Sequence, residues 1–444
     1  MSTPDTAEAP VAAGGGLLAS LRRHGDLFTN AGSLMATTVV TSGTGFAYWW
    51  LAARQASPEA VGQASAAVSA MTLIGTVGMF GMGTMLISEL PRMTARRWSL
   101  ISACLLVAGV VATIGGLGYV AVARFAVPGL RAALGSPTAT VLLVAGIALT
   151  AMTLVLDEAL LGLLAGPMQL LRNTYFSVIK LALLAGLVLL PLTVTGGALL
   201  ATWLAGAVIS VGLLAGPLRR RGLLGPIRPR LAMLRGKGRL AFDHNVLNLA
   251  AFLPRTAMPL VVTAVLSTQA TAAFYTAWMV LSFIAMIPGN VAITLYAVGS
   301  GDREALGSKV RMGLLICLGA GIPASIVLMV AARPIMSIFG ETYATLAGGA
   351  LAILALTYVP FVFHHFYLAV ARVQGRVRQA GLFAIVAGIA EIAAATYGGS
   401  QGSLDDLVWW LAAVMAVETV LVAPTVLRVA LPSSWLRRPG GAAR

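Results

Sequence analysis

Charged residues are scarce in this sequence: Asp, Glu, Lys and Arg make up 10% of 444 residues, whereas 58% are apolar. Soluble domains carry about 25% charged residues, so the composition excludes an ordinary soluble enzyme. The mean hydropathy is +0.89, and the apolar runs of about 20 residues predict helices that cross a bilayer. An outer-membrane barrel is excluded, because its strands would alternate in polarity at every second residue.

Residues that carry enzymatic or metal chemistry are also scarce. The two cysteines, Cys104 and Cys317, each lie inside an apolar run, which excludes a disulfide framework and a CxxC metal pair. The sequence contains no P-loop, GxSxG or HExxH motif, and the longest expected outer loop, roughly 124–138, is too short for an extracytoplasmic glycosyltransferase domain. We therefore expect no enzyme, cofactor or metal site. His365 leaves a membrane O-acyltransferase as the one enzymatic alternative.

Hydropathy predicts twelve spans, which begin and end on the same side of the membrane. They cover approximately 28–52, 60–90, 99–123, 139–165, 173–191, 196–217, 241–265, 269–298, 309–332, 345–371, 378–397 and 404–430. In this topology 24 of the 30 basic residues fall on one side, which the positive-inside rule identifies as the cytoplasm. We expect a multi-pass protein of the cytoplasmic membrane with both termini in the cytoplasm. The net charge of +15 reflects this topology and contact with anionic membrane lipids, not nucleic-acid binding.

The longest connection divides the chain into two halves of six spans each. We expect a disordered cytoplasmic tail (1–27), an N-terminal six-helix lobe (28–217), a basic cytoplasmic linker (218–240), a C-terminal six-helix lobe (241–431) and a cytoplasmic tail (432–444). An even number of spans keeps both halves in the same orientation, as in transporters with parallel repeats. Residues 165–183 align without a gap to residues 371–389. The predicted fold class is an all-α polytopic membrane protein with two lobes related by a parallel repeat.

The first 92 residues resemble a known family. The segments LFTNAGS (27–33), YWWLAAR (48–54), SPEAVG (57–62) and GTMLISELPR (83–92) are similar to the opening of the polysaccharide-biosynthesis flippases of the O-antigen and teichoic-acid type. These flippases belong to the multidrug/oligosaccharidyl-lipid/polysaccharide exporter superfamily. The resemblance implies two six-helix lobes around a central cleft. It also implies that a polyprenyl-diphosphate-linked oligosaccharide is moved from the inner to the outer leaflet for cell-surface polysaccharide synthesis.

Such a substrate needs a wet cavity with fixed positive charge, because an unpaired anion in hydrocarbon is very costly. Polar residues recur at helical spacing in the first, second, seventh and eighth spans, which predicts cavity-facing stripes. Hydroxyl groups that bond back to their own helix are the alternative explanation. The candidate substrate-binding residues are Arg255, Asn245, Asn248, Ser33, Thr37, Thr41, Ser69, Thr72 and Tyr275.

Arg255 is the most informative of these residues. It lies about 21 Å from the cytoplasmic end of its predicted span, too deep for the side chain to reach the interface easily. The three interpretations are contact with the diphosphate, a structural ion pair and a misplaced span.

Ionisable residues inside the other spans are candidates for ion coupling. Lys180 lies at the same predicted depth as Asp157 and Glu158, so we expect it to pair with one of them. The alternative is that these three residues form a coupling site. Glu391 and Glu418 are expected at different depths, so direct contact between them is not predicted, and either is a candidate site for H⁺ or Na⁺.

The sequence therefore predicts an alternating-access flippase whose partners are a lipid-linked sugar, membrane lipids and a coupling ion. The alternative is an ion-coupled multidrug or cation antiporter of the same superfamily. The intramembrane acids outnumber the intramembrane bases, so the sequence leaves both open.

Overall fold

The computed structural model describes residues 37, 40–93, 96–125, 136–190, 193–235, 254, 256–299 and 306–431. Helices dominate this part of the chain, in which a single isolated β-bridge joins Ala56 and Val194. Nine of the described helices are long and apolar enough to cross a membrane, or ten if a bent pair counts as one span. The predicted all-α membrane fold is confirmed.

Where the structure describes them, the helices follow the predicted spans, whereas most of the span expected at 241–265 and the start of the span expected at 28–52 lie outside the described residues. Residues 40–55 are helical, and the N-terminal half continues with α2 (Pro58–Gly78), α3 (Met82–Glu89), η1 (Leu90–Arg92), α4 (Arg97–Phe125), α6 (Pro137–Gly162), α7 (Gly166–Leu189), α8 (Gly196–Arg220) and η2 (Leu231–Leu234). The C-terminal half contains a short helix (Thr256–Val265), α10 (Thr268–Gly299), α11 (Leu306–Val330), α12 (Ala332–Ser337), α13 (Glu341–Ala355), α14 (Tyr358–Val373), α15 (Val377–Ser400) and α16 (Leu404–Ala430).

Hydroxyl caps set the starts of several spans. The Ser57 hydroxyl accepts the backbone N–H of Ala60 at 3.2 Å, and Pro58 occupies the first helical position of α2. Ser136 and Thr195 cap α6 and α8 in the same way. Such a cap satisfies one of the N–H groups that a helix leaves without an internal partner.

Two predicted spans are interrupted in the structure. The span expected at 60–90 breaks after α2, where Phe80 and Gly81 adopt positive φ values of 45° and 72°. The span expected at 345–371 is the pair α13 and α14, bent by 47°. By contrast, α10 continues through Pro288.

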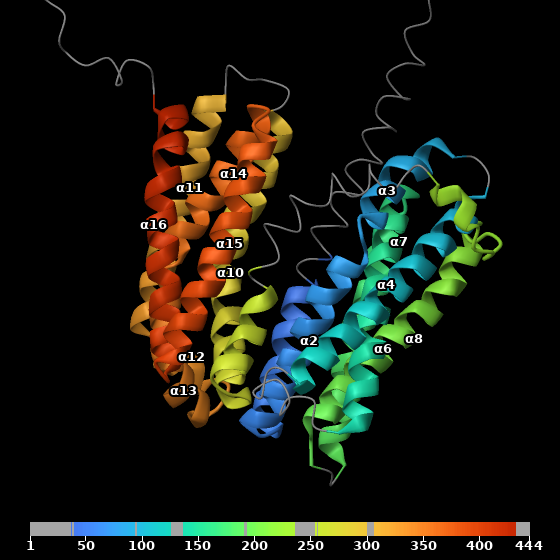
Figure 1. Ribbon diagram of the computed structural model, residues 1–444, viewed down its shortest axis with the longest axis horizontal. Coiled ribbons are helices and arrows are strands. Elements are labelled where there is room, and N and C mark those ends of the chain that lie inside the picture. The colour runs from blue at the N-terminus through green and yellow to red at the C-terminus, as the bar shows by residue number, and fades with distance from the viewer. Residues whose placement is uncertain are drawn as a thin grey trace, which may run out of the picture.

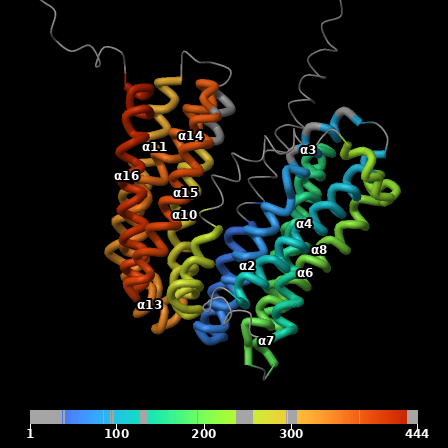
Figure 2. The backbone as a smooth tube through the Cα atoms, in the orientation of Figure 1, coloured from blue at the N-terminus to red at the C-terminus, as the bar shows by residue number. Residues whose placement is uncertain are grey.

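The helices form two lobes (Figure 1). The N-terminal lobe contains residues 40–55 and α2–α8, and the C-terminal lobe contains Thr256–Val265 and α10–α16. The lobes lie close together at the end that carries α12 and α13 and diverge toward the end that carries α3 (Figure 1). The tube in Figure 2 shows the same divergence. The two-lobe architecture predicted from the sequence is confirmed.

A backbone contact joins the two lobes where α2 meets α10. A Cβ atom added to Gly62 would lie 1.6 Å from the carbonyl oxygen of Thr268, so only glycine allows this approach. Nearby, the Trp50 indole and the Arg54 guanidinium both donate to the Ile338 carbonyl, at 2.9 and 3.0 Å. We call these two hydrogen bonds the Ile338 latch. They link the first helix to the turn after α12.

Candidate functional site

A cavity of about 400 Å³ lies between the lobes. Residues 41–49, α7 and α8 supply its N-terminal wall, and α10 supplies the opposite wall. Its floor contains Phe46, whose ring lies 5.4 Å from Phe339, and Trp49, whose ring lies 4.9 Å from Tyr275. These aromatic contacts belong to a buried cluster that includes residues of both lobes. The complete lining is Thr41, Ser42, Gly45, Phe46, Trp49, Asn173, Phe176, Ser177, Lys180, Trp203, Tyr275, Met279, Ser282, Phe283 and Met286.

Lys180 is the single charged residue among the described lining residues of this cavity. Its ammonium lies 3.7 Å from the ring centroid of Trp203, 4.5 Å from that of Phe176 and 5.4 Å from that of Tyr48. The side chain is 3% exposed. We call these three rings the aromatic cage. Ring faces carry partial negative charge and attract a cation, so the cage favours the charged form of Lys180, and no acid is among the described residues that line the cavity.

The predicted pairing of Lys180 with Asp157 or Glu158 is wrong. The carboxylate of Asp157 instead accepts a hydrogen bond from the Arg172 guanidinium at 2.6 Å, and both residues are buried. Equal depth along two helices does not fix the direction in which the side chains point. Lys180 faces α8, where its Cβ would lie 3.0 Å from a Cβ added to Gly206.

Asn173 connects the Arg172–Asp157 pair to the cavity. Its side-chain oxygen accepts from Arg172 at 2.7 Å, its amide donates to Asp157 at 3.2 Å, and the residue also lines the cavity. One carboxylate oxygen of Asp157 has no hydrogen-bond partner among the described residues. Glu158, the neighbouring candidate, packs against Gly83 of α3.

Ser177 lies one helical turn before Lys180 and lines the same wall. The residue is fully buried, and its hydroxyl has no hydrogen-bond partner in the described part of the chain. A buried polar group without a partner costs free energy that a ligand can recover. Ser177 and Lys180 together therefore present a donor and a positive charge to the cavity.

The substrate-binding candidates from the sequence are divided by the structure. Thr41 and Tyr275 line the cavity, and the Thr41 hydroxyl donates to the carbonyl of Thr37 at 2.7 Å. Ser69 and Thr72 lie in α2 and are absent from the cavity lining, and the Thr72 hydroxyl bonds back to the Val68 carbonyl at 2.8 Å. Ser33, Asn245, Asn248 and Arg255 lie outside the described residues.

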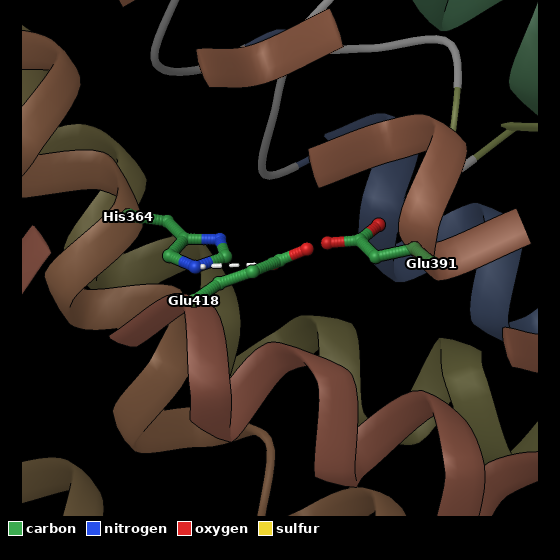
Figure 3. A group of neighbouring side chains, drawn as sticks. All are labelled: His364, Glu391 and Glu418. Carbon is green, nitrogen blue, oxygen red and sulfur yellow. Dashed lines mark ion pairs between the residues drawn. The ribbon is translucent and has the colours of Figure 1, made fainter. Parts of the chain in front are cut away.

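A second group of ionisable residues lies within the C-terminal lobe. His364 of α14, Glu391 of α15 and Glu418 of α16 place their ligand atoms within 4.8 Å of one another. The Nε2 atom of His364 lies 3.4 Å from Glu418 Oε2, and the two carboxyl groups face each other (Figure 3). We call these three residues the acid–histidine cluster. None of them lines the central cavity.

The expectation that Glu391 and Glu418 lie too far apart for contact is wrong. Different depths along two helix axes do not exclude contact, because packed helices tilt and a glutamate side chain is long. Two carboxylates this close repel each other if both are charged, so a proton or a cation between them lowers the energy. The donor set of one imidazole and two carboxylates could also hold a metal ion, and the absence of a metal site stays a prediction.

Comparison with known proteins gives a family match in the C-terminal half of the chain. The model of the MatE family matches residues 248–395. The search of curated proteins found no match.

Solved structures match nearly the whole chain. An inward-facing multidrug resistance MATE family transporter of the MOP superfamily aligns with a TM-score of 0.66 and 15% identity, covering 90% of this chain and 96% of that chain. The lipid II flippase MurJ, in an inward closed conformation, aligns with a TM-score of 0.66 and 12% identity, covering 90% of each chain. A MOP superfamily transporter from Pyrococcus furiosus, described as having a binding pocket of reverse polarity, aligns with a TM-score of 0.60 and 15% identity, covering 90% of this chain and 94% of that chain.

These matches show that the chain shares its fold with a multidrug resistance MATE family transporter and with the lipid II flippase MurJ. The three matched structures are those of transporters and a flippase. The fold leaves the substrate open, and the charge and lining residues of the cavity bear on it.

Proposed function

We propose that this protein is a flippase that moves a polyprenyl-diphosphate-linked oligosaccharide across the cytoplasmic membrane by alternating access. The observation that carries the proposal is the charge of the central cavity. Among the described residues that line the cavity, only Lys180 is charged. The Ser177 hydroxyl, which has no hydrogen-bond partner among the described residues, lies one helical turn away. A diphosphate placed there gains a charge-assisted contact with Lys180 and satisfies the Ser177 hydroxyl.

The rest of the lining suits a sugar attached to that diphosphate. Trp49, Trp203 and Tyr275 provide flat rings against which the apolar faces of sugar rings pack, while Asn173 and Ser282 supply hydrogen-bonding groups. The volume of about 400 Å³ lies within the usual range of ligand pockets, about 300–1,000 Å³. The lipid tail stays in the bilayer, because transfer of hydrocarbon from the bilayer into a polar, wet cavity is unfavourable.

The distribution of basic residues supports an orientation for this state. Arg219, Arg220 and Arg221 at the end of α8 lie on the basic side of the predicted topology, which the positive-inside rule assigns to the cytoplasm. The lobes meet at the opposite end, where the Ile338 latch lies. We therefore assign this structure to the state that receives substrate from the cytoplasmic side.

The second candidate function is a cation-coupled multidrug antiporter, which the acid–histidine cluster favours. Its two carboxylates could exchange H⁺ or Na⁺ during transport. The cluster lies away from the central cavity, however, so it serves equally well as the coupling site of a flippase. A cationic drug in the central cavity would meet the positive charge of Lys180.

The test uses purified protein and a fluorescent polyprenyl-diphosphate sugar. Lys180→Met keeps the apolar stem and removes the charge. We expect its affinity for the lipid-linked sugar to fall about 10- to 100-fold, because a hydrogen bond to a charged group contributes about 1.5–3 kcal/mol. Flipping in proteoliposomes should fall in parallel.

Lys180→Arg is the matched control, because it keeps the charge next to the rings, and we expect it to retain most of the binding. Unchanged binding in Lys180→Met would overturn the proposal. Transport of a cationic dye by the wild type, improved by Lys180→Met, would favour the antiporter instead.

A further inference from the structure

A second cavity, of about 630 Å³, lies in the N-terminal lobe where the segment 222–230 folds over the start of α4. It shares no lining residue with the central cavity. Its walls include four arginines, two at the start of α4 and two in the segment after α8: Arg96, Arg97, Arg228 and Arg230. We call this the four-arginine pocket.

The pocket is held together by specific contacts, so its arginines are not those of a free loop. The indole of Trp98 donates to the carbonyl of Leu223, and the backbone N–H of Arg230 donates to the carbonyl of Ser99 at 3.4 Å. Trp98 also packs closely on Gly225, where an added Cβ would lie 3.0 Å from the ring. Leu223 and Leu224 pack against the buried cluster of the N-terminal lobe.

Within the described part of the chain, no acid compensates the charge of the pocket. No acidic residue lines it, and none of its four arginines forms an ion pair with any residue that the structure describes. Arg97 is the first residue of α4, whose first turn contains no acid. A helix N-terminus carries partial positive charge and favours anions, so the placement of arginines there adds repulsion that a bound anion would relieve.

The surroundings of the pocket point to a membrane lipid as the source of that anion. Two large apolar side chains next to the arginines are exposed: Ile227 at 64% and Leu231 at 54%. The pocket lies at the ends of α4 and α8, both of which are long and apolar enough to span a membrane. Apolar and basic side chains at the end of a span are typical of the interface between headgroups and acyl chains.

We propose that the four-arginine pocket binds the phosphate headgroup of an anionic phospholipid. The phosphate lies among the guanidinium groups, which form paired hydrogen bonds with phosphate oxygens. Ile227 and Leu231 contact the acyl region beside it. The bound lipid fixes the first part of the connection between the lobes onto the N-terminal lobe.

The test measures lipid binding to the full-length protein in detergent by native mass spectrometry, with phosphatidylglycerol as the probe. The variant Arg228→Gln/Arg230→Gln removes two charges at exposed positions, so folding should be unaffected. Each basic residue near an anionic lipid contributes roughly a fivefold change in affinity, so we expect about 30-fold weaker binding.

The matched control is Arg219→Gln/Arg221→Gln, which removes two charges from the neighbouring exposed positions outside the pocket. We expect its affinity to stay within about twofold of the wild type. Equal losses in both variants would show that charge acts diffusely and would overturn the pocket. Equal binding of phosphatidylcholine, or displacement of the lipid by millimolar inorganic phosphate, would overturn the assignment to an anionic phospholipid.

Discussion

Single residues decide which charges this membrane protein can carry. Lys180 lies among aromatic rings, Asp157 accepts a hydrogen bond from Arg172, and Glu418 lies beside His364 and Glu391. Only the first of these three groups lines the central cavity. The proposed substrate-binding residue Lys180 and the proposed coupling residues of the acid–histidine cluster therefore lie in different lobes.

At this scale we predict that Glu418→Gln uncouples transport from the ion gradient. The substitution removes one of two facing carboxylates, so the acid–histidine cluster loses its affinity for H⁺ or Na⁺. Coupling free energies are typically 1–3 kcal/mol, so we expect gradient-driven flipping in proteoliposomes to fall about tenfold. Binding of the lipid-linked sugar should not change, because Glu418 does not line the cavity.

The control for this experiment is Glu341→Gln, which neutralises an exposed acid at the start of α13. A Glu418→Gln protein that still accelerates fully when a pH or sodium gradient is applied would remove the cluster from the coupling mechanism.

At the scale of elements, two helices can pack backbone against backbone only where one of them has a glycine. The α2–α10 contact brings the Gly62 position against the Thr268 backbone, and no side-chain rearrangement can make room for a methyl group there. This contact joins the two lobes at one end.

We predict that Gly62→Ala destabilises the protein by about 1–3 kcal/mol, the usual cost of forcing extra volume into a packed interface. The melting temperature in detergent should fall. Gly118→Ala in α4 is the control, because an added Cβ there meets nothing within 4 Å. A melting temperature for Gly62→Ala equal to that of Gly118→Ala would contradict the close contact.

The sequence predicted the elements better than the directions of their side chains. Hydropathy located the helices because each apolar run must cross the bilayer, whatever its neighbours are. It could not reveal that Lys180 points toward Trp203, because that depends on how α7 rotates against α8. One available signal was missed: Asn173, Ser177 and Lys180 follow one another at helical spacing on α7, and all three line the cavity.

For the whole molecule, the Ile338 latch is the polar part of the closed end. Trp50 and Arg54 come from the N-terminal lobe and Ile338 from the C-terminal lobe, so both hydrogen bonds must break if the lobes separate there. The aromatic contact between Phe46 and Phe339 must separate as well.

We predict that Trp50→Phe/Arg54→Gln shifts the population toward molecules that are open at this end. Two hydrogen bonds at about 0.5–1.5 kcal/mol each give a shift of about 1–3 kcal/mol. Spin labels at Gln55 and Thr342, which are exposed on opposite lobes, should report longer distances. Arg333→Gln, at an exposed arginine of α12, should leave the distances as in the wild type, and an unchanged distribution in the double variant would show that the latch does not hold this end closed.

The aromatic cage has a consequence for how cargo is released. Tyr48, Phe176 and Trp203 all belong to the N-terminal lobe, so in the proposed alternating-access cycle Lys180 and its rings would move together, away from the α10 wall. Among the described residues no acid pairs with the ammonium, so the proposed diphosphate would displace no internal partner on arrival. Release of the substrate would then depend on hydration of Lys180. Water that enters from the newly opened side would screen the attraction between the ammonium and the diphosphate.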